Sequence, residues 1–505
     1  MKFFLFSIPI LIGLAQGQFD PNYVPDRNVI VHLFQWKYTD IANECENFLG
    51  PNGFAGIQID SPAENVIVTE AQYSGYPDRP WWERYQIVSY KLDQTRAGSY
   101  AELADMISRC NAAGVRIYAD AVFNHMAGLG ALMEGTAGST GNSVIRSFPD
   151  VPYIITHFHI PCGINDYNDA NQVRNCDLVG APDLNQALSY VRGKIIDYLN
   201  SLIGLGVAGF RIDSAKHIWP QDLQAIASSL ADLNTAHGFA PGSRPFIYQE
   251  VINVGPEAVS KYEYTDIGDV TEFLYSVSIG GVFKKFEGHH LSELANWGQP
   301  WGFLPSNRAL VFVENHDNER GHGAGGDLIL TYKDGKVYRM AVSFGLAHPY
   351  GVSRIMSSYD FTDTEVGPPM DANQDVISPS INPDGSCGNG WVCQHRWHQI
   401  YSMVRFKNVV KDAELSNWWS NGNNQIAFAR SGRGFVAFNN EGSDMSVNLQ
   451  TSLPAGTYCD VISGGKDGTS CTGKSVVVQD DGTADIVIGA AEDDGVLAIH
   501  IDEKL

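Results

Sequence analysis

Gly209 to His217, with the sequence GFRIDSAKH, is the stretch that decides the fold of this chain. It is predicted to be a short strand, Gly-Phe-Arg-Ile-Asp, that ends in a loop at its acidic residue. Successive side chains of a strand point to opposite faces, so Arg211 and Asp213 should share one face. A lone Asp at a strand end is most often the cap of the following helix. The neighbouring Arg, and the recurrence of this design elsewhere, favour a functional acid.

Short apolar runs alternate with longer amphipathic segments on both sides of this stretch. The expected strands cover 29–34, 56–60, 115–122, 209–213, 246–250, 269–274, 310–315 and 350–355, and the expected helices cover 38–49, 100–113, 187–205, 222–237 and 337–346. Such alternation predicts a parallel sheet with right-handed crossovers. Eight units predict an α/β fold, the closed (β/α)8 TIM barrel, whose site lies at the carboxyl ends of the strands.

Two segments break this alternation. Residues 124–185 are rich in Gly, Asn and Asp with little periodicity, and they are too long for a simple loop. Short alternating runs such as 425–430, 434–439 and 475–479 dominate the end of the chain. We therefore predict a barrel over 18–123 and 186–413, a small domain inserted after the third strand over 124–185, and a C-terminal all-β Greek-key sandwich over 414–505.

Composition limits the partners and the compartment. The 505 residues carry 57 acidic and 34 basic side chains, a net charge of -23, which argues against nucleic acid and anionic membranes as partners. Residues 1–17 combine a Lys, an apolar run and small residues in the pattern of a secretory signal peptide. No other apolar run is long enough to cross a bilayer. A secreted protein is expected.

Cysteine usage agrees with export. The chain has eight cysteines, an even number that favours four disulfides in an exported protein. Spacing alone leaves 105 possible pairings open. No pair has the CxxC spacing of a zinc or redox site, and no Asn-x-Ser/Thr sequon is present.

Acidic residues recur where the predicted strands end. Asp120 closes the third strand, Asp213 the fourth, Glu250 the fifth, and Asp317 follows the seventh. Each alone could be a helix cap or an ion-pair partner, but in a barrel all should converge on one site. Converging carboxylates without a Cys/His metal set or a phosphate loop suit glycosidic bond cleavage. That reaction needs one carboxylate beside an oxocarbenium-like centre and one acid that protonates the leaving oxygen.

Four motifs identify a family. DAVFNH (120–125), GFRIDSAKH (209–217), IYQEV (247–251) and FVENHD (312–317) resemble, in order and spacing, the four signature regions of the α-amylase family of glycoside hydrolases. The resemblance covers nearly the whole mature chain. HLFQW, RPWWERYQ, GHGAGG and HPYGVSRIMSSY are similar to the chloride-dependent α-amylases of animals.

This resemblance implies an endo-acting hydrolase of internal α-1,4-glucosidic bonds in starch, glycogen and maltooligosaccharides, acting by a retaining double displacement. It implies that Asp213 is the nucleophile, Glu250 the general acid/base and Asp317 the third carboxylate, which orients substrate. Arg211 should keep the nucleophile ionised, and crowding should keep Glu250 protonated. Retention predicts about 5 to 5.5 Å between the Asp213 and Glu250 carboxyl groups.

The resemblance also implies two ions and a set of sugar contacts. The implied chloride ligands are Arg211, Asn315 and Arg354, although the two arginines could instead pair with acids. The implied calcium ligands, which clamp the inserted domain to the barrel, are Asn124, Arg174, Asp183 and His217, with Arg174 and His217 acting through main-chain carbonyls. The implied substrate contacts are Trp81, Trp82, Tyr85, Asp120, His125, Tyr167, Lys216, His316 and His322. The Gly-rich run 321–326 should form a flexible flap over the substrate.

The same resemblance implies disulfides Cys45–Cys110, Cys162–Cys176, Cys387–Cys393 and Cys459–Cys471. A vertebrate-type fifth bridge is absent, which fits an invertebrate protein. A monomer is expected, and proteinaceous amylase inhibitors are compatible partners.

Some residues depart from the family pattern. The run 60–65 reads DSPAEN, residues 70–78 form a loop longer by about six residues, and Glu314 replaces an Asp and should point outward. Two alternatives stay open: an α-glucosidase or transglucosylase that releases glucose from maltose, and a non-catalytic glucan-binding relative.

Overall fold

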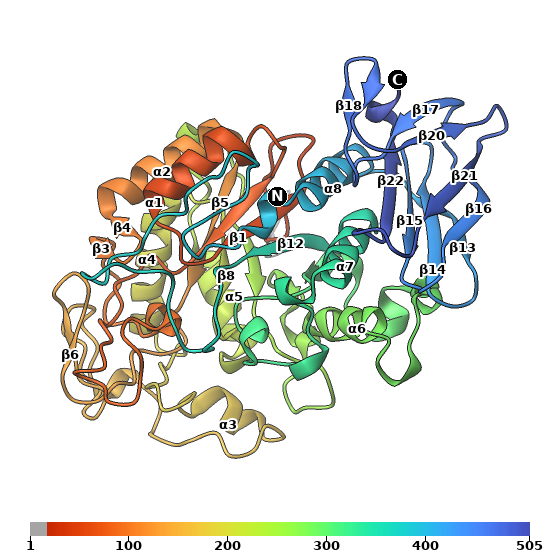
Figure 1. Cartoon of the computed structure of the whole chain (residues 1–505). Helices are drawn as coiled ribbons and strands as arrows, with labels where there is room; N and C mark the ends of the chain where they lie inside the picture. The colour runs from red at the N-terminus through yellow and green to blue at the C-terminus, as the bar shows by residue number, and fades with distance from the viewer. Residues whose placement is uncertain (1–17) are drawn as a thin grey trace, which may run out of the picture.

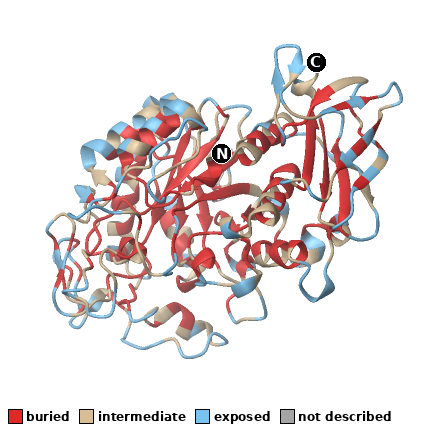
Figure 2. Cartoon of the chain, in the orientation of Figure 1, coloured by how far each residue is buried: buried red, intermediate tan, exposed pale blue. Residues whose placement is uncertain are grey.

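Eight parallel strands close a barrel in a computed structural model that describes residues 18–505. The predicted signal peptide, 1–17, lies outside the described residues. The strand order is β1-β12-β11-β10-β9-β8-β5-β2, and nearly every strand residue is buried (Figures 1 and 2). The strands are β1 (Val29–Leu33), β2 (Gly56–Ile59), β5 (Arg116–Ala121), β8 (Gly209–Ile212), β9 (Phe246–Gln249), β10 (Asp269–Thr271), β11 (Ala309–Val311) and β12 (Val352–Ser357). The predicted TIM barrel is confirmed.

Helices form the outer layer of the barrel. They are α1 (Tyr38–Glu44), continued by η1 (Cys45–Leu49), α2 (Tyr100–Ala112), α4 (Ser189–Leu205), α5 (Pro220–Ser229), α6 (Phe273–Phe283), α7 (Lys336–Ala347) and α8 (His398–Val409). Helix α2 begins at a capping box, in which Ser99 and Glu102 satisfy each other's main-chain N–H groups. Helix α4 ends at Gly206, whose φ of 106° is left-handed.

Three predicted elements need correction. The helix expected over 222–237 ends at Ser229, because the next residue adopts an extended backbone. The strand expected over 269–274 ends at Thr271, because the Glu272 carboxylate accepts from the Leu274 N–H and caps α6. The strand expected over 310–315 shrinks to β11, and its last residues enter the loop that carries the site.

Strand β8 packs tightly against the neighbouring strand β9. Gly209 in β8 pairs with Phe246 in β9, and a Cβ added at Gly209 would lie 2.2 Å from the Phe246 carbonyl oxygen. Glycine is therefore required where the two strands meet.

A long excursion separates β5 from α4. It carries β6 (Met133–Glu134), β7 (Thr140–Gly141), the short η3 (Ile155–His157) and α3 (Ala170–Asn175), and it lies below and to the left of the barrel in Figure 1. The buried Glu64 carboxylate ties it to the barrel by accepting from the N–H groups of Ala137 and Ser139 at 2.8 and 2.9 Å. The domain limits 124–185 stay a prediction.

The end of the chain forms antiparallel sheets with a core of their own. One sheet has the order β13 (Leu415–Ser420), β14 (Gln425–Arg430), β15 (Gly434–Asn439) and β22 (Val496–His500). The strands β16 (Met445–Gln450) and β21 (Thr483–Ile488) pair separately, as do β17 (Gly456–Cys459) and β20 (Ser475–Val478), and β18 (Lys466–Asp467) and β19 (Ser470–Cys471). The buried Arg430 joins this unit to the barrel by donating to the carbonyls of Ala347, Val410 and Ala413. The predicted C-terminal all-β domain is confirmed.

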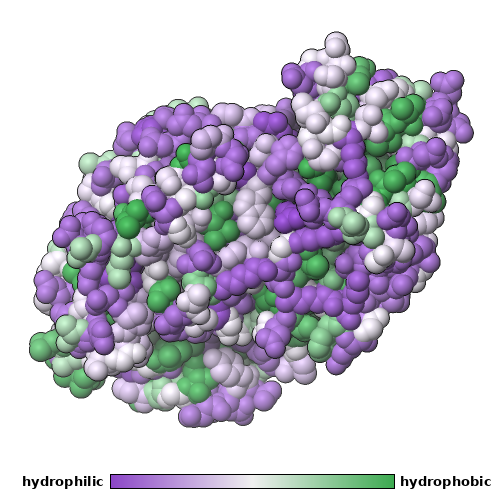
Figure 3. Space-filling view, in the orientation of Figure 1, coloured by the Kyte–Doolittle hydropathy of each residue, from purple (hydrophilic) through white to green (hydrophobic). Residues whose placement is uncertain are grey.

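All four disulfides implied by the resemblance are formed. They are Cys45–Cys110, Cys162–Cys176, Cys387–Cys393 and Cys459–Cys471. Within the described chain, no helix is both long and apolar enough to span a bilayer. Most of the face drawn in Figure 3 is hydrophilic, with separate hydrophobic groups.

Candidate active site

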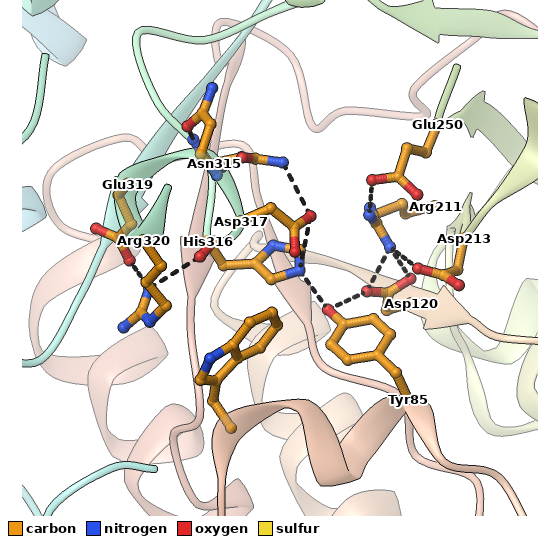
Figure 4. A network of polar contacts seen from close by, with 12 residues as sticks. Tyr85, Asp120, Arg211, Asp213, Glu250, Asn315, His316, Asp317, Glu319 and Arg320 are labelled. Carbon is orange, nitrogen blue, oxygen red and sulfur yellow. Dashed lines mark hydrogen bonds and ion pairs between the residues drawn. The ribbon is translucent and has the colours of Figure 1, made fainter. Parts of the chain in front are cut away.

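Arg211 is the centre of the site at the carboxyl end of the barrel. It is 1% exposed and lies opposite Asp120 in the register between β8 and β5. Its Nη1 donates to both oxygens of Asp120 at 2.7 and 2.8 Å and to Asp213 Oδ1 at 2.9 Å, and its Nη2 donates to Glu250 Oε1 at 2.5 Å (Figure 4). The shared face predicted for Arg211 and Asp213 is confirmed, and one guanidinium holds three carboxylates.

The turn after β8 fixes the relative positions of Asp213 and Glu250. Ser214 adopts a left-handed backbone, with a φ of 50°, which is unusual for a residue with a side chain. This conformation lets its N–H donate to Glu250 Oε2 at 2.8 Å, while its Oγ donates to Asp213 Oδ2 at 2.9 Å. Ser214 was not singled out from the sequence, although it lies inside the fourth-strand motif.

Burial raises the pKa values of several site acids. The pKa of Asp120 rises to about 7, because burial outweighs the attraction of Arg211. The pKa of Glu250 is raised by burial and by the nearby Asp213 charge, as expected for an acid that carries a proton near neutral pH. The pKa of Asp317 rises to about 8, through burial and then the charge of Glu250.

A neutral histidine connects Asp317 to the other acids. Tyr85 donates to Asp120 Oδ2 at 3.0 Å, so its oxygen accepts from Nε2 of His316 at 2.7 Å. Burial holds the pKa of His316 well below its usual value, and its Nδ1 has no hydrogen-bond partner in the described chain. His316 Nε2 also lies 3.4 Å from Asp317 Oδ2. The predicted substrate residues Tyr85 and His316 are thus part of the acid network.

Aromatic side chains line one side of the site. Trp81 meets His316 edge-on, with ring centroids 5.6 Å apart, and its Nε1 donates to the Thr364 carbonyl. Trp82 Nε1 donates to Glu365 Oε2 at 2.9 Å, and the other oxygen of Glu365 lies 3.1 Å from Nε2 of the exposed His322. The predicted contacts Trp81, Trp82 and His322 therefore lie along one rim.

Behind Trp81 lies a buried cation. Arg320 is paired with Glu319, donates to the His316 carbonyl and lies over four aromatic rings, those of Phe34, Trp81, Tyr359 and Phe361. This arrangement places a buried cation in contact with both Trp81 and His316. No spacing in the sequence indicated it.

A cleft opens on the other side of Glu250. It is lined by Glu250, Ser214 and Gly323, by the predicted substrate residues Tyr167 and Lys216, and by His217, a predicted calcium ligand. Lys216 donates to the Ile252 carbonyl, pairs with Glu257 and lies 5.0 Å from the centre of the Tyr167 ring. Glu257 was not predicted, because it lies in a loop without a recognisable pattern.

The predicted chloride ligands Arg354 and Asn315 differ from Arg211 in their hydrogen-bond partners. Arg354 on β12 donates through Nη1 to Gln58, and its buried Nη2 has no hydrogen-bond partner among residues 18–505. Burial lowers the pKa of Arg354 to about 10, and the charge of Arg211 adds to this effect. Asn315 accepts from the Asn318 N–H and directs its amide toward Asp317 at 3.5 Å.

The predicted calcium ligands form two groups at the base of the excursion. Asn124 and Asp183 lie together, because Asp183 forms a short bridge with His125, the neighbour of Asn124, and each of the two has a buried side-chain oxygen without a partner in the described chain. Burial raises the pKa of Asp183 to about 7. His125, a predicted sugar contact, is buried beside them and its Nε2 lies 3.2 Å from the Tyr85 carbonyl.

Arg174 and His217 form the second group. Nδ1 of His217 lies 2.7 Å from the Val173 carbonyl, which brings α3 against the loop after β8. The Tyr264 hydroxyl lies within hydrogen-bond distance of the carbonyls on either side of His217 and of the Arg174 side chain. Within residues 18–505 no three His, Cys, Asp or Glu side chains form a metal-binding cluster, so a cation here would rely on the Asp183 carboxylate together with amide and main-chain oxygens.

Glu314 departs from the expected exposure. It points away from the barrel interior, as predicted, but it is only 2% exposed and bonds the Tyr338 hydroxyl of α7. Burial raises its pKa well above the usual value, which favours the uncharged form of this side chain between the strand and helix layers.

Comparison with known proteins agrees with this architecture. Residues 76–272 match the family model described as "Alpha amylase, catalytic domain", and residues 418–502 match "Alpha amylase, C-terminal all-beta domain". The chain is 56% identical to an α-amylase of Tribolium castaneum, over 98% of this chain and 99% of that protein. It is 57% identical to an α-amylase of Tenebrio molitor, over 97% and 100%.

Solved structures give the same result. A variant of α-amylase I from Eisenia fetida, in complex with maltohexaose, superposes with a TM-score of 0.90 at 42% identity, over 96% of this chain and 99% of that one. The barrel, its carboxylates and its β domain define a glycoside hydrolase. The chain belongs to the α-amylase family, and its activity is that of an endo-acting α-amylase.

Proposed function

We propose that this enzyme cleaves internal α-1,4-glucosidic bonds of starch, glycogen and maltooligosaccharides by a retaining double displacement. The observation that carries the proposal is a set of hydrogen bonds. Arg211 and Ser214 each donate to both the Asp213 and the Glu250 carboxylate. Two carboxylates fixed side by side, one of them with a raised pKa, suit the two roles that retention requires.

In the first step Glu250 gives its proton to the glycosidic oxygen while Asp213 attacks the anomeric carbon. The bond to the leaving sugar breaks, and a glycosyl ester of Asp213 forms. In the second step the Glu250 carboxylate takes a proton from water, whose oxygen attacks the same carbon and releases Asp213. Asp317, beside His316, orients the sugar hydroxyls.

The sharpest test is the stereochemistry of the first product. Proton NMR of fresh maltoheptaose hydrolysis should show the α anomer first, and an initial β anomer would contradict the roles given to Asp213 and Glu250. Release of mixed maltooligosaccharides from starch, with no glucose from maltose, separates this activity from that of an α-glucosidase.

Chloride is proposed as a ligand of Arg354, with Arg211 and Asn315 nearby. The fit depends on Arg354, whose Nη2 is buried without a partner, whereas Arg211 already binds three carboxylates. A bound anion would supply the missing negative charge next to this guanidinium. Removal of chloride should lower kcat, and Arg354→Gln should abolish the response to added chloride; equal kcat with and without chloride would contradict the site.

Calcium is proposed at Asn124, Asp183 and the main-chain carbonyls of Arg174 and His217. The two unpartnered buried oxygens of Asn124 and Asp183 suit a hard cation, which favours oxygen ligands. The ion would hold the excursion against the loop that follows the nucleophile. EDTA should lower the melting temperature of the wild type and have a much smaller effect on Asn124→Ala, and an equal effect on both would contradict this assignment.

Secretion is proposed from the predicted signal peptide and the four disulfides. Expression in insect cells with the natural leader should place the enzyme in the medium, with Gln18 at or near its N-terminus.

A further inference from the structure

The loop at residues 69–79 is firmly attached at its base and on one side. The Arg79 N–H donates to the Val68 carbonyl at 2.8 Å, and the Glu70 N–H donates to Asp78 Oδ1 at 2.9 Å, which closes the base. The Tyr73 hydroxyl donates to the Leu132 carbonyl in the excursion at 3.2 Å. The loop therefore holds its tip in a defined place beside η2 (Trp81–Tyr85).

At this tip Tyr76 extends the aromatic rim. Its ring meets that of Trp82 edge-on, with centroids 4.9 Å apart and planes at 76°. Tyr76 is nevertheless 43% exposed, so the contact with Trp82 leaves much of its surface open. A Tyr76 ring that served only to pack against Trp82 would not need to stay this exposed.

The rim has a direction. Next to the acids stand Tyr85 and His316, whose rings stack at 5.4 Å, then Trp81 at 5.6 Å from His316, then its neighbour Trp82, and last Tyr76. Sugar rings bind flat aromatic faces, and two rings set at a steep angle form a corner that contacts one sugar on two sides. Glu365, between Trp82 and His322, adds a carboxylate that can accept from sugar hydroxyls.

We propose that Tyr76 and Trp82 form an outer glucosyl subsite that is occupied by long α-glucan chains and not by short ones. This inference concerns the substrate range of the α-amylase activity. The lengthened loop then adds one sugar contact, that of Tyr76, at the far end of the cleft. This contact favours polymeric substrates.

The test compares substrates of different length in the complete enzyme. Tyr76→Ala should lower kcat/KM for maltoheptaose and soluble starch by about three- to tenfold, the range expected for one aromatic contact. The loss should be much smaller for a chromogenic maltotrioside, which is too short to reach the subsite. Tyr76→Phe, which keeps the ring, should retain the preference for long substrates.

A double-mutant cycle separates direct contact from support of Trp82. If Tyr76 contacts the glucan itself, Tyr76→Ala should still lower kcat/KM for maltoheptaose in a Trp82→Ala background. An effect that vanishes in that background, an equal loss on short and long substrates, or no loss on maltoheptaose would each overturn the proposal. Turnover of the maltotrioside by the wild type tests the catalytic centre separately, because this substrate is too short to reach the outer subsite.

Discussion

Replacing Arg211 by Gln is expected to destabilise the barrel, and to do so more strongly at alkaline than at acidic pH. The change removes the cation that binds Asp120, Asp213 and Glu250 and leaves these carboxylates buried together. Breaking a buried ion pair from one side costs about 3–5 kcal/mol. For 505 residues the unfolding entropy is about 1 kcal/mol/K, so the melting temperature should fall by about 3–5 °C at pH 8.

The pH dependence follows from the direction of the pKa shifts. In the native protein the pKa of Asp120 is about 7 and that of Asp317 about 8, both above the value of about 4 in an unfolded chain. Such groups contribute stability that is present below about pH 4 and is lost as pH rises through 7 to 8. Without Arg211 these pKa values rise further, so the difference between variant and wild type should widen from pH 5 to pH 8.

Calorimetry at pH 5 and pH 8, at one chloride concentration, measures both effects. Lys411→Gln, which removes an exposed ion pair with Asp26, is the matched control and should change stability by less than about 1 kcal/mol at either pH. Equal melting temperatures of Arg211→Gln and wild type at pH 8, or a larger loss of stability at pH 5 than at pH 8, would contradict this expectation.

Three further changes test other parts of the structure. Glu250→Gln should lower kcat on maltoheptaose by about 10²- to 10⁴-fold, because the proposed proton donor is lost; activity within tenfold of wild type would contradict the proposed role. Gly209→Ala should lower the free energy of unfolding by about 1–3 kcal/mol, since its Cβ would clash with the Phe246 carbonyl, and an unchanged urea midpoint would refute this. Glu314→Gln should cost less than about 1 kcal/mol at pH 7 in the same assay, because burial raises the pKa of Glu314 well above its usual value and favours its neutral form beside Tyr338; a larger cost would contradict this expectation.

The barrel could be predicted because its strands are short, apolar and separated by amphipathic helices. Helix α6 gave no such signal, since its residues are apolar on most sides and no polar face marks the period. The end of the helix at Ser229 was also missed, because the sequence beyond it continues with helix-compatible residues.

The acids of the site could be predicted because they follow strands, and barrel strands end at one rim. Arg211 could be placed beside Asp213 in the same way, but other residues that support the site could not be predicted. Ser214 acts through a left-handed backbone, and Arg320 acts through rings contributed by distant segments. Neither the backbone angle nor the aromatic cage leaves a pattern in residue spacing, so both required the three-dimensional structure.

The pairing of the disulfides determines how the barrel and the C-terminal sheets are linked covalently. Each bridge links consecutive cysteines of the chain, and none connects the barrel to the C-terminal sheets. The exposed Lys411, between α8 and β13, offers trypsin a cleavage point with three bridges before it and one after it. A cut there would leave two internally cross-linked fragments held together by non-covalent contacts alone, among them the hydrogen bonds from the Arg430 guanidinium to the carbonyls of Ala347 and Val410 on the other fragment.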